Sequence, residues 1–157
     1  MTAPVSRWER HADSLLGVAA SAILMAMMLL TVVDVVARYV FNRPLAGAFE
    51  VTELMLLVLI FAGLPLVTYA DEHAVMDFID RLLSPRAQDA LRRVVQVASA
   101  AVMFLLTWLI WLKADRIWAY RDATDVLRIL YGPFVYFMAI TIGLAGIIHL
   151  YKGLARR

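Results

Sequence analysis

The chain has 157 residues, of which 63% are hydrophobic and only 18% are charged. Soluble domains average about 25% charged residues, so this composition excludes an ordinary water-soluble globular domain. The absence of cysteine excludes disulfides and thiolate metal sites. The net charge of +2 does not indicate nucleic-acid binding, because membrane proteins concentrate Lys and Arg in their cytoplasmic loops.

Four long apolar stretches dominate the sequence. They cover about residues 15–36, 51–70, 94–112 and 129–150. About 20 apolar residues cross the hydrocarbon core of a bilayer, so each stretch predicts a transmembrane helix. We therefore expect an all-α integral membrane protein with a single four-helix domain over residues 1–157.

The first stretch has some features of a signal peptide. It follows Arg7 and Arg10, and Ala20-Ser21-Ala22 has the small-residue form of a cleavage site. That triplet lies inside the apolar run, however, and the run exceeds the ~7–15 apolar residues of a signal peptide. We interpret this stretch as the first membrane helix.

The connection between the first two stretches holds the densest polar cluster. Asp34 and Arg38 have the i, i+4 spacing of a helical ion pair, and Glu50 and Glu53 open the second helix, where the helix dipole favours acids. The cluster either pairs internally and caps helix ends, or forms a recognition surface for a partner. The candidate residues are Asp34, Arg38, Asn42, Arg43, Glu50 and Glu53.

The connection between the second and third stretches predicts two features. Its apolar residues recur with helical spacing, which indicates a short amphipathic helix at the membrane interface, over about residues 74–83. Ser84-Pro85 then has the pattern of an N-cap followed by a first helical proline, so we expect the third helix to begin near Pro85.

Pairs of small residues four positions apart predict faces where helices pack closely, because small side chains let backbones approach in a bilayer. Three such pairs stand in the apolar stretches: Gly17 with Ser21, Ala22 with Ala26, and Ala139 with Gly143.

The distribution of cations predicts the orientation. Nine Lys and Arg residues fall in the N-terminal segment, the second connection and the C-terminal tail, against six in the first and third connections. The side with more Lys and Arg is cytoplasmic, so we expect both termini in the cytoplasm.

Residues suited to chemistry are scarce. The middles of the four stretches lack Asp, Glu, Lys, Arg and His, although intramembrane charges usually mark transport pathways. We find no catalytic motif, so we expect no enzyme, no catalytic residue, no cofactor and no metal ion. The acids and His73 over residues 71–80 are metal-capable types, but a charged interfacial segment explains them better.

Two other protein classes stay open at this point. His11 and His149 lie at the same predicted side of the membrane, which leaves a haem-binding membrane anchor of a respiratory enzyme as the alternative. A self-assembling small exporter is the third class, but it needs an ionisable residue inside a span.

The first connection also resembles a known family. The run Arg38-Tyr39-Val40-Phe41-Asn42-Arg43-Pro44-Leu45, followed by Glu50 and Glu53-Leu54, is similar to the signature of the small permease subunit of TRAP transporters, the DctQ-like family. Looser similarity continues through His73 and Asp77, then Thr124 and Leu127, and finally Tyr136 and Gly143.

This resemblance implies a multi-pass protein of the bacterial inner membrane that works in a tripartite system. A periplasmic binding protein delivers an organic acid, and a larger permease subunit holds the Na+ and substrate sites. The small subunit is then a scaffold that forms a heterodimer with the large one and meets the binding protein transiently.

Overall fold

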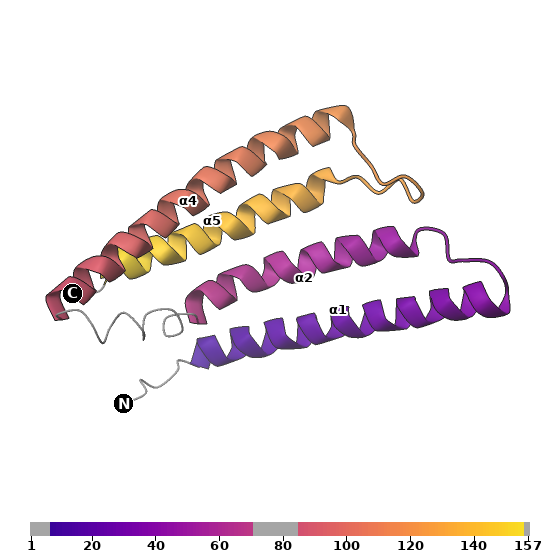
Figure 1. The fold of residues 1–157 in the computed structure, drawn as a ribbon, viewed down its shortest axis with the longest axis horizontal. Coiled ribbons are helices and arrows are strands. Elements are labelled where there is room, and N and C mark those ends of the chain that lie inside the picture. Colours follow the sequence, from indigo (N-terminus) through magenta and orange to yellow (C-terminus); the bar gives the residue numbers. More distant parts are fainter. Residues whose placement is uncertain (1–6, 71–84, 156–157) are drawn as a thin grey trace. The chain divides into compact units, whose positions relative to one another are not determined.

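The computed structural model describes residues 7–70 and 85–155, which form four α-helices without a β-strand in those ranges. They are α1 (Arg7–Val40), α2 (Ala48–Ala70), α4 (Pro85–Tyr120) and α5 (Gly132–Ala155) (Figure 1). The interfacial helix predicted over residues 74–83 and the acids and His73 over 71–80 lie outside the described residues.

Each of these helices is long and apolar enough to cross a membrane. The candidate spans are Gly17–Val40, Ala48–Thr68, Ala90–Tyr120 and Gly132–Leu154. The shortest has 21 residues, about 32 Å at 1.5 Å per residue, which matches a hydrocarbon core of about 30 Å. The prediction of four helices long and apolar enough to span a membrane is confirmed.

The helix boundaries follow local backbone chemistry. The third helix begins at Pro85 as predicted, because proline suits the first helical turn. The last helix begins at Gly132 rather than at residue 129. Arg128 has a left-handed backbone (φ 56°), and Ile129 pairs back across the loop with Thr124, so these residues cannot continue into a helix.

Left-handed residues also end two helices. Arg121 (φ 53°) closes α4 in a Schellman motif, in which the N–H of Asp122 donates to the carbonyl of Ile117 and that of Arg121 to Trp118. Asn42 (φ 50°) follows the end of α1, and Pro44 prevents any continuation. Both helices therefore end at defined residues, and a short connection follows each of them.

The chain divides into two compact units. The first comprises Met1–Ile60 with Ala123–Leu130, and the second comprises Phe61–Asp122 with Tyr131–Arg157. The loop 123–130 therefore groups with α1 and the start of α2, although it connects α4 to α5. The single-domain prediction stays a prediction.

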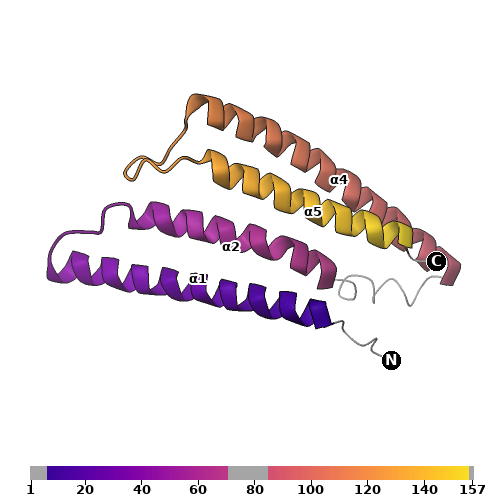
Figure 2. The ribbon, with the colours of Figure 1, turned by 180° about the vertical axis from the view of Figure 1, so that it is seen from behind.

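In the second unit, α4 and α5 pack as an antiparallel pair, which is visible from both sides of the molecule (Figures 1 and 2). Small residues on α5 face α4: a Cβ at Gly143 would lie 3.4 Å from Thr107, and one at Gly146 would lie 3.2 Å from Met103. Ala139 is fully buried. The packing face predicted from Ala139 and Gly143 is confirmed.

The small residues explain why this pair is close. On α4, Ala100 and Ala114 are buried and stand two heptads apart, with Thr107 midway between them. A seven-residue repeat keeps one face of a helix toward its antiparallel neighbour. By contrast, the small pairs on α1 are exposed within this chain: Gly17 with Ser21, and Ala22 with Ala26.

Polar contacts join α4 and α5 at their connected ends. The Tyr136 hydroxyl donates to Oδ1 of Asp115 at 2.5 Å, and the rings of Trp111 and Tyr136 meet edge to face with centroids 5.2 Å apart. Aromatic residues at the end of a span place the ring in the interface and the polar atom toward water. These contacts join α4 and α5 to each other at this end of the pair.

Candidate functional site

Asp34 closes the connection between α1 and α2. Its Oδ2 accepts a hydrogen bond from Nη2 of Arg38 at 2.8 Å, and its Oδ1 accepts one from the backbone N–H of Leu45 at 2.7 Å. The Asp34 side chain is 17% exposed and that of Arg38 is 60% exposed. One carboxylate therefore holds both the neighbouring turn of α1 and the far end of the loop.

Asn42 and Arg43 act through their backbones. Asn42 adopts the left-handed conformation that asparagine tolerates better than most residues. The next residue, Arg43, donates its N–H to the carbonyl of Ala37 at 3.2 Å. Both side chains are exposed. The two residues shape the turn, and their side chains stay accessible.

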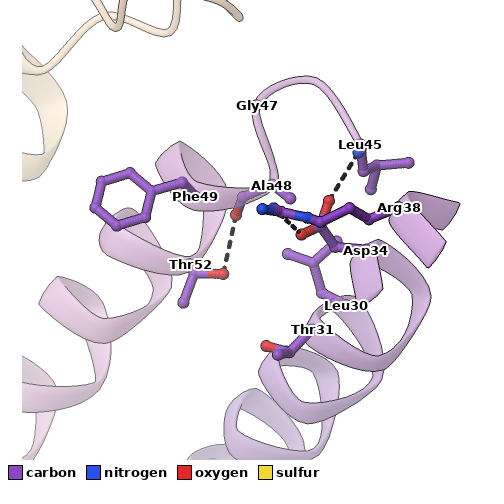
Figure 3. Close-up of a pocket in the computed structure, with 9 residues that line it drawn as sticks. All are labelled: Leu30, Thr31, Asp34, Arg38, Leu45, Gly47, Ala48, Phe49 and Thr52. Atoms are coloured by element: carbon purple, nitrogen blue, oxygen red, sulfur yellow. Dashed lines mark hydrogen bonds and ion pairs between the residues drawn. The ribbon is translucent and has the colours of Figure 1, made fainter. Parts of the chain in front are cut away.

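A hollow of about 290 Å³ opens beside the Asp34–Arg38 ion pair (Figure 3). It is bounded by the last turns of α1, the connection and the first turns of α2. The residues that line it are Leu30, Thr31, Asp34, Arg38, Leu45, Gly47, Ala48, Phe49 and Thr52.

Glu50 has a different environment, in the first turn of α2. Its Oε1 accepts the backbone N–H of Val126 at 2.7 Å, and its Oε2 accepts that of Leu127 at 2.9 Å. Glu50 is only 9% exposed. Hydrogen bonds to an ionised acceptor are about twice as strong as neutral ones, so this carboxylate fastens the loop 123–130 to the start of α2.

The loop has an internal framework of its own. Thr124, which is 1% exposed, accepts the N–H of Ile129 on its hydroxyl at 3.0 Å and donates its own N–H to the Ile129 carbonyl at 2.9 Å. A backbone bridge joins Ala123 and Leu130. The loop thus presents the amides of Val126 and Leu127 as a pair.

Gly47 lets the loop come close. Its φ is +80°, a value that residues other than glycine rarely adopt. A Cβ at this position would also overlap the Leu127 side chain. The Leu127 side chain therefore occupies space that any side chain at position 47 would need.

The six candidate residues do not form one site. Asp34 and Arg38 pair with each other, Glu50 binds the loop, Asn42 and Arg43 form the turn, and Glu53 is exposed. Sequence reasoning missed the partners of Glu50, because backbone amides look the same in every sequence. The only signal was the resemblance that included Thr124 and Leu127.

Polar side chains also meet at the other end of the second unit. Nδ1 of His149 is hydrogen-bonded to Oε1 of Gln96 at 2.7 Å, and Nζ of Lys152 donates to the Thr68 carbonyl at 2.7 Å. A cation suits a helix C-terminus, where carbonyls lack partners, so Lys152 caps the end of α2.

The haem alternative gains no support. His149 already has a side-chain partner in Gln96. Among the residues whose side chains the structure describes, no group of three His, Cys, Asp or Glu is placed to hold a metal ion.

Four helices of membrane-spanning length indicate a multi-pass α-helical membrane protein. Residues 27–156 match the family described as "Tripartite ATP-independent periplasmic transporters, DctQ component". The chain belongs to this family, and it is a small membrane subunit of a TRAP transporter. No curated protein matches the sequence.

Proposed function

We propose that this chain is the scaffold subunit in Na+-coupled, binding-protein-dependent uptake of an organic acid. It forms a heterodimer with the large permease subunit in the bacterial inner membrane, and it meets the periplasmic binding protein transiently. The observation that carries this proposal is the family match over residues 27–156. The absence of charged residues from the middles of the apolar stretches supports it, since a scaffold needs no transport site of its own.

The proposal includes an arrangement in the membrane. The four helices form one domain, both termini are cytoplasmic, and the segment 74–83 lies at the cytoplasmic interface. The connection 41–47 and the loop 121–131 then face the periplasm. The protein performs no catalysis and holds no cofactor.

The polar residues of the first connection have a role in this proposal. The contacts of Asp34 to Arg38 and Leu45 support hairpin ordering. Arg43 and Glu53 are exposed, so they are the candidates for direct contact with a partner subunit. The ordered hairpin presents them in a fixed arrangement.

Co-purification tests the subunit role. Tagged chain extracted from its host in mild detergent should bring down a large polytopic membrane protein at about one-to-one stoichiometry, identified by mass spectrometry. A chain that purifies alone as an oligomer, or with a soluble redox enzyme, contradicts the proposal.

Reconstitution tests the coupling. Vesicles with both membrane subunits and the binding protein should accumulate an organic acid only under an inward Na+ gradient. Uptake that persists without Na+ would contradict the Na+ coupling. Uptake that persists without this chain would contradict its role as a required subunit.

Substitutions test the hairpin. Asp34→Asn should weaken assembly and uptake together, because an amide cannot pair with Arg38 as a carboxylate does. Arg43→Ala and Glu53→Ala should weaken assembly without altering the helical content of the isolated chain. Unchanged assembly and uptake in all three variants would show that the cluster is only structural.

A further inference from the structure

The hollow beside Asp34 and Arg38 lies at a defined depth. Its lining runs from Leu30 to Arg38 on α1 and from Ala48 to Thr52 on α2. The candidate spans end at Val40 and begin at Ala48, so the hollow occupies the last turns of one span and the first turns of the next. This is where the hydrocarbon core gives way to lipid headgroups.

Arg38 brings a cation into the hollow. Its guanidinium has five N–H donors, and in the described part of the chain Nη2 to Asp34 is the one hydrogen bond that it makes. The side chain is 60% exposed, and Figure 3 shows it extending from α1 beside the start of α2. The remaining donors are therefore open to an anion.

The rest of the lining is mostly apolar or already satisfied. Leu30, Leu45 and Phe49 form apolar walls, and Phe49 is 81% exposed. The hydroxyls of Thr31 and Thr52 donate to carbonyls one turn back in their own helices, at 2.8 and 2.9 Å. An occupant must therefore combine one anionic group with apolar groups beside it.

We propose that this hollow binds a phospholipid, with the phosphate on the Arg38 guanidinium and the acyl chains along the apolar surfaces of α1 and α2. Planar guanidinium donors match phosphate oxygens, and a bilayer supplies phosphate at this depth. Because Asp34 balances the charge of Arg38, the ion pair is neutral and suits a zwitterionic headgroup such as phosphatidylethanolamine. The proposal needs the membrane location but not the subunit role proposed above.

Native mass spectrometry of the purified full chain provides the test. With phosphatidylethanolamine added, the chain should retain one lipid, and Arg38→Gln should retain at least about tenfold less, since a charge-assisted hydrogen bond contributes that much or more. Diacylglycerol with the same acyl chains lacks the phosphate. Its retention by the unchanged chain should therefore be as low as the retention of phosphatidylethanolamine by Arg38→Gln.

Three variants keep the result interpretable. Arg43→Gln removes an exposed cation that does not line the hollow, so it should retain lipid as the unchanged chain does. Thr52→Phe should fill the hollow and lose the lipid while Arg38 is intact. Arg38→Lys should recover part of the retention, and circular dichroism should show equal helicity throughout.

Several outcomes would overturn the proposal. Equal retention by Arg38→Gln, equal losses in Arg43→Gln, or equal binding of diacylglycerol would show that the phosphate is not recognised at Arg38. If the isolated chain retained the lipid but the complex with the large subunit did not, the hollow would be a contact surface for that subunit rather than a lipid site. Lipid retention is measured on the isolated chain, so it can be tested even if the chain never co-purifies with a partner.

Discussion

Glu50 lies in the first turn of α2, yet its carboxylate accepts hydrogen bonds from amides 76 and 77 residues further along the chain. A carboxylate this buried, at 9% exposure, needs such partners, because burying an unpaired charge costs far more than burying a paired one. Glu50 is therefore sensitive to substitution.

Glu50→Gln should loosen the loop 123–130. An amide oxygen can accept from one of the two N–H groups, so we expect a loss of about 1–2 kcal/mol in loop stability, or roughly 5–30-fold faster opening. Hydrogen–deuterium exchange of a peptide covering Val126 and Leu127 measures this directly. Glu53→Gln is the matched control, because Glu53 is exposed, and equal exchange in both variants would contradict the role of Glu50.

Gly47→Ala should destabilise the protein for two reasons. The backbone at φ +80° disfavours a side chain, and the new Cβ would overlap Leu127. We expect a cost of about 1–3 kcal/mol, seen as a lower thermal midpoint in detergent.

Two further variants separate the causes at Gly47. Adding Leu127→Ala should recover the part that comes from overlap but not the part that comes from φ. Gly63→Ala, within α2 and with nothing within 4 Å of the new Cβ, should be neutral or slightly stabilising. A similar loss at Gly63 would mean that the midpoint reports something other than local packing.

Among the elements, the antiparallel pair α4 and α5 depends on small side chains. Gly143 and Gly146 face Thr107 and Met103, and Ala139 is fully buried. In a bilayer the hydrophobic effect contributes little to helix association, so close packing and short polar contacts must hold the helices together. Tyr136 and Asp115 supply such a contact at one end of this pair.

Gly146→Leu should separate α4 from α5. A Cβ at this position would already lie 3.2 Å from Met103, so a leucine overpacks the interface at a cost of about 1–3 kcal/mol. The thermal midpoint should fall, and a cysteine pair placed across the interface at Gly143 and Thr107 should cross-link less efficiently.

Gly17→Leu offers the same substitution on α1, where nothing lies within 4 Å of the new Cβ. It should leave both readouts of the isolated chain unchanged. Equal changes in thermal midpoint and cross-linking in Gly17→Leu and Gly146→Leu would contradict the role of Gly146 in packing α4 against α5.

At the scale of the whole molecule, the absence of cysteine makes the orientation directly measurable. With both termini cytoplasmic, Arg43→Cys should react with a membrane-impermeant maleimide in intact spheroplasts. Arg157→Cys, in the C-terminal tail, should react only after lysis. The reverse pattern would contradict the proposed orientation and would place the hollow in the opposite leaflet.

Much of the fold was predictable because the bilayer imposes a local requirement. A spanning segment must satisfy its own backbone hydrogen bonds, so a long apolar run becomes a helix whatever its neighbours do. The runs near 15–36, 51–70 and 94–112 lie inside α1, α2 and α4. The fourth helix starts three residues later than predicted, because Arg128 and Ile129 take part in a loop that hydropathy does not describe.

The candidate site was predictable only in part. The i, i+4 spacing of Asp34 and Arg38 is a local relation, so sequence indicated it directly. The sequence by itself therefore determined the membrane class, the helices and the family signature, since each depends on neighbouring residues. Only the tertiary structure decided that Glu50 binds Val126 and Leu127, that Gly47 admits Leu127, and that Arg38 borders a hollow, because these contacts join segments that no local pattern relates.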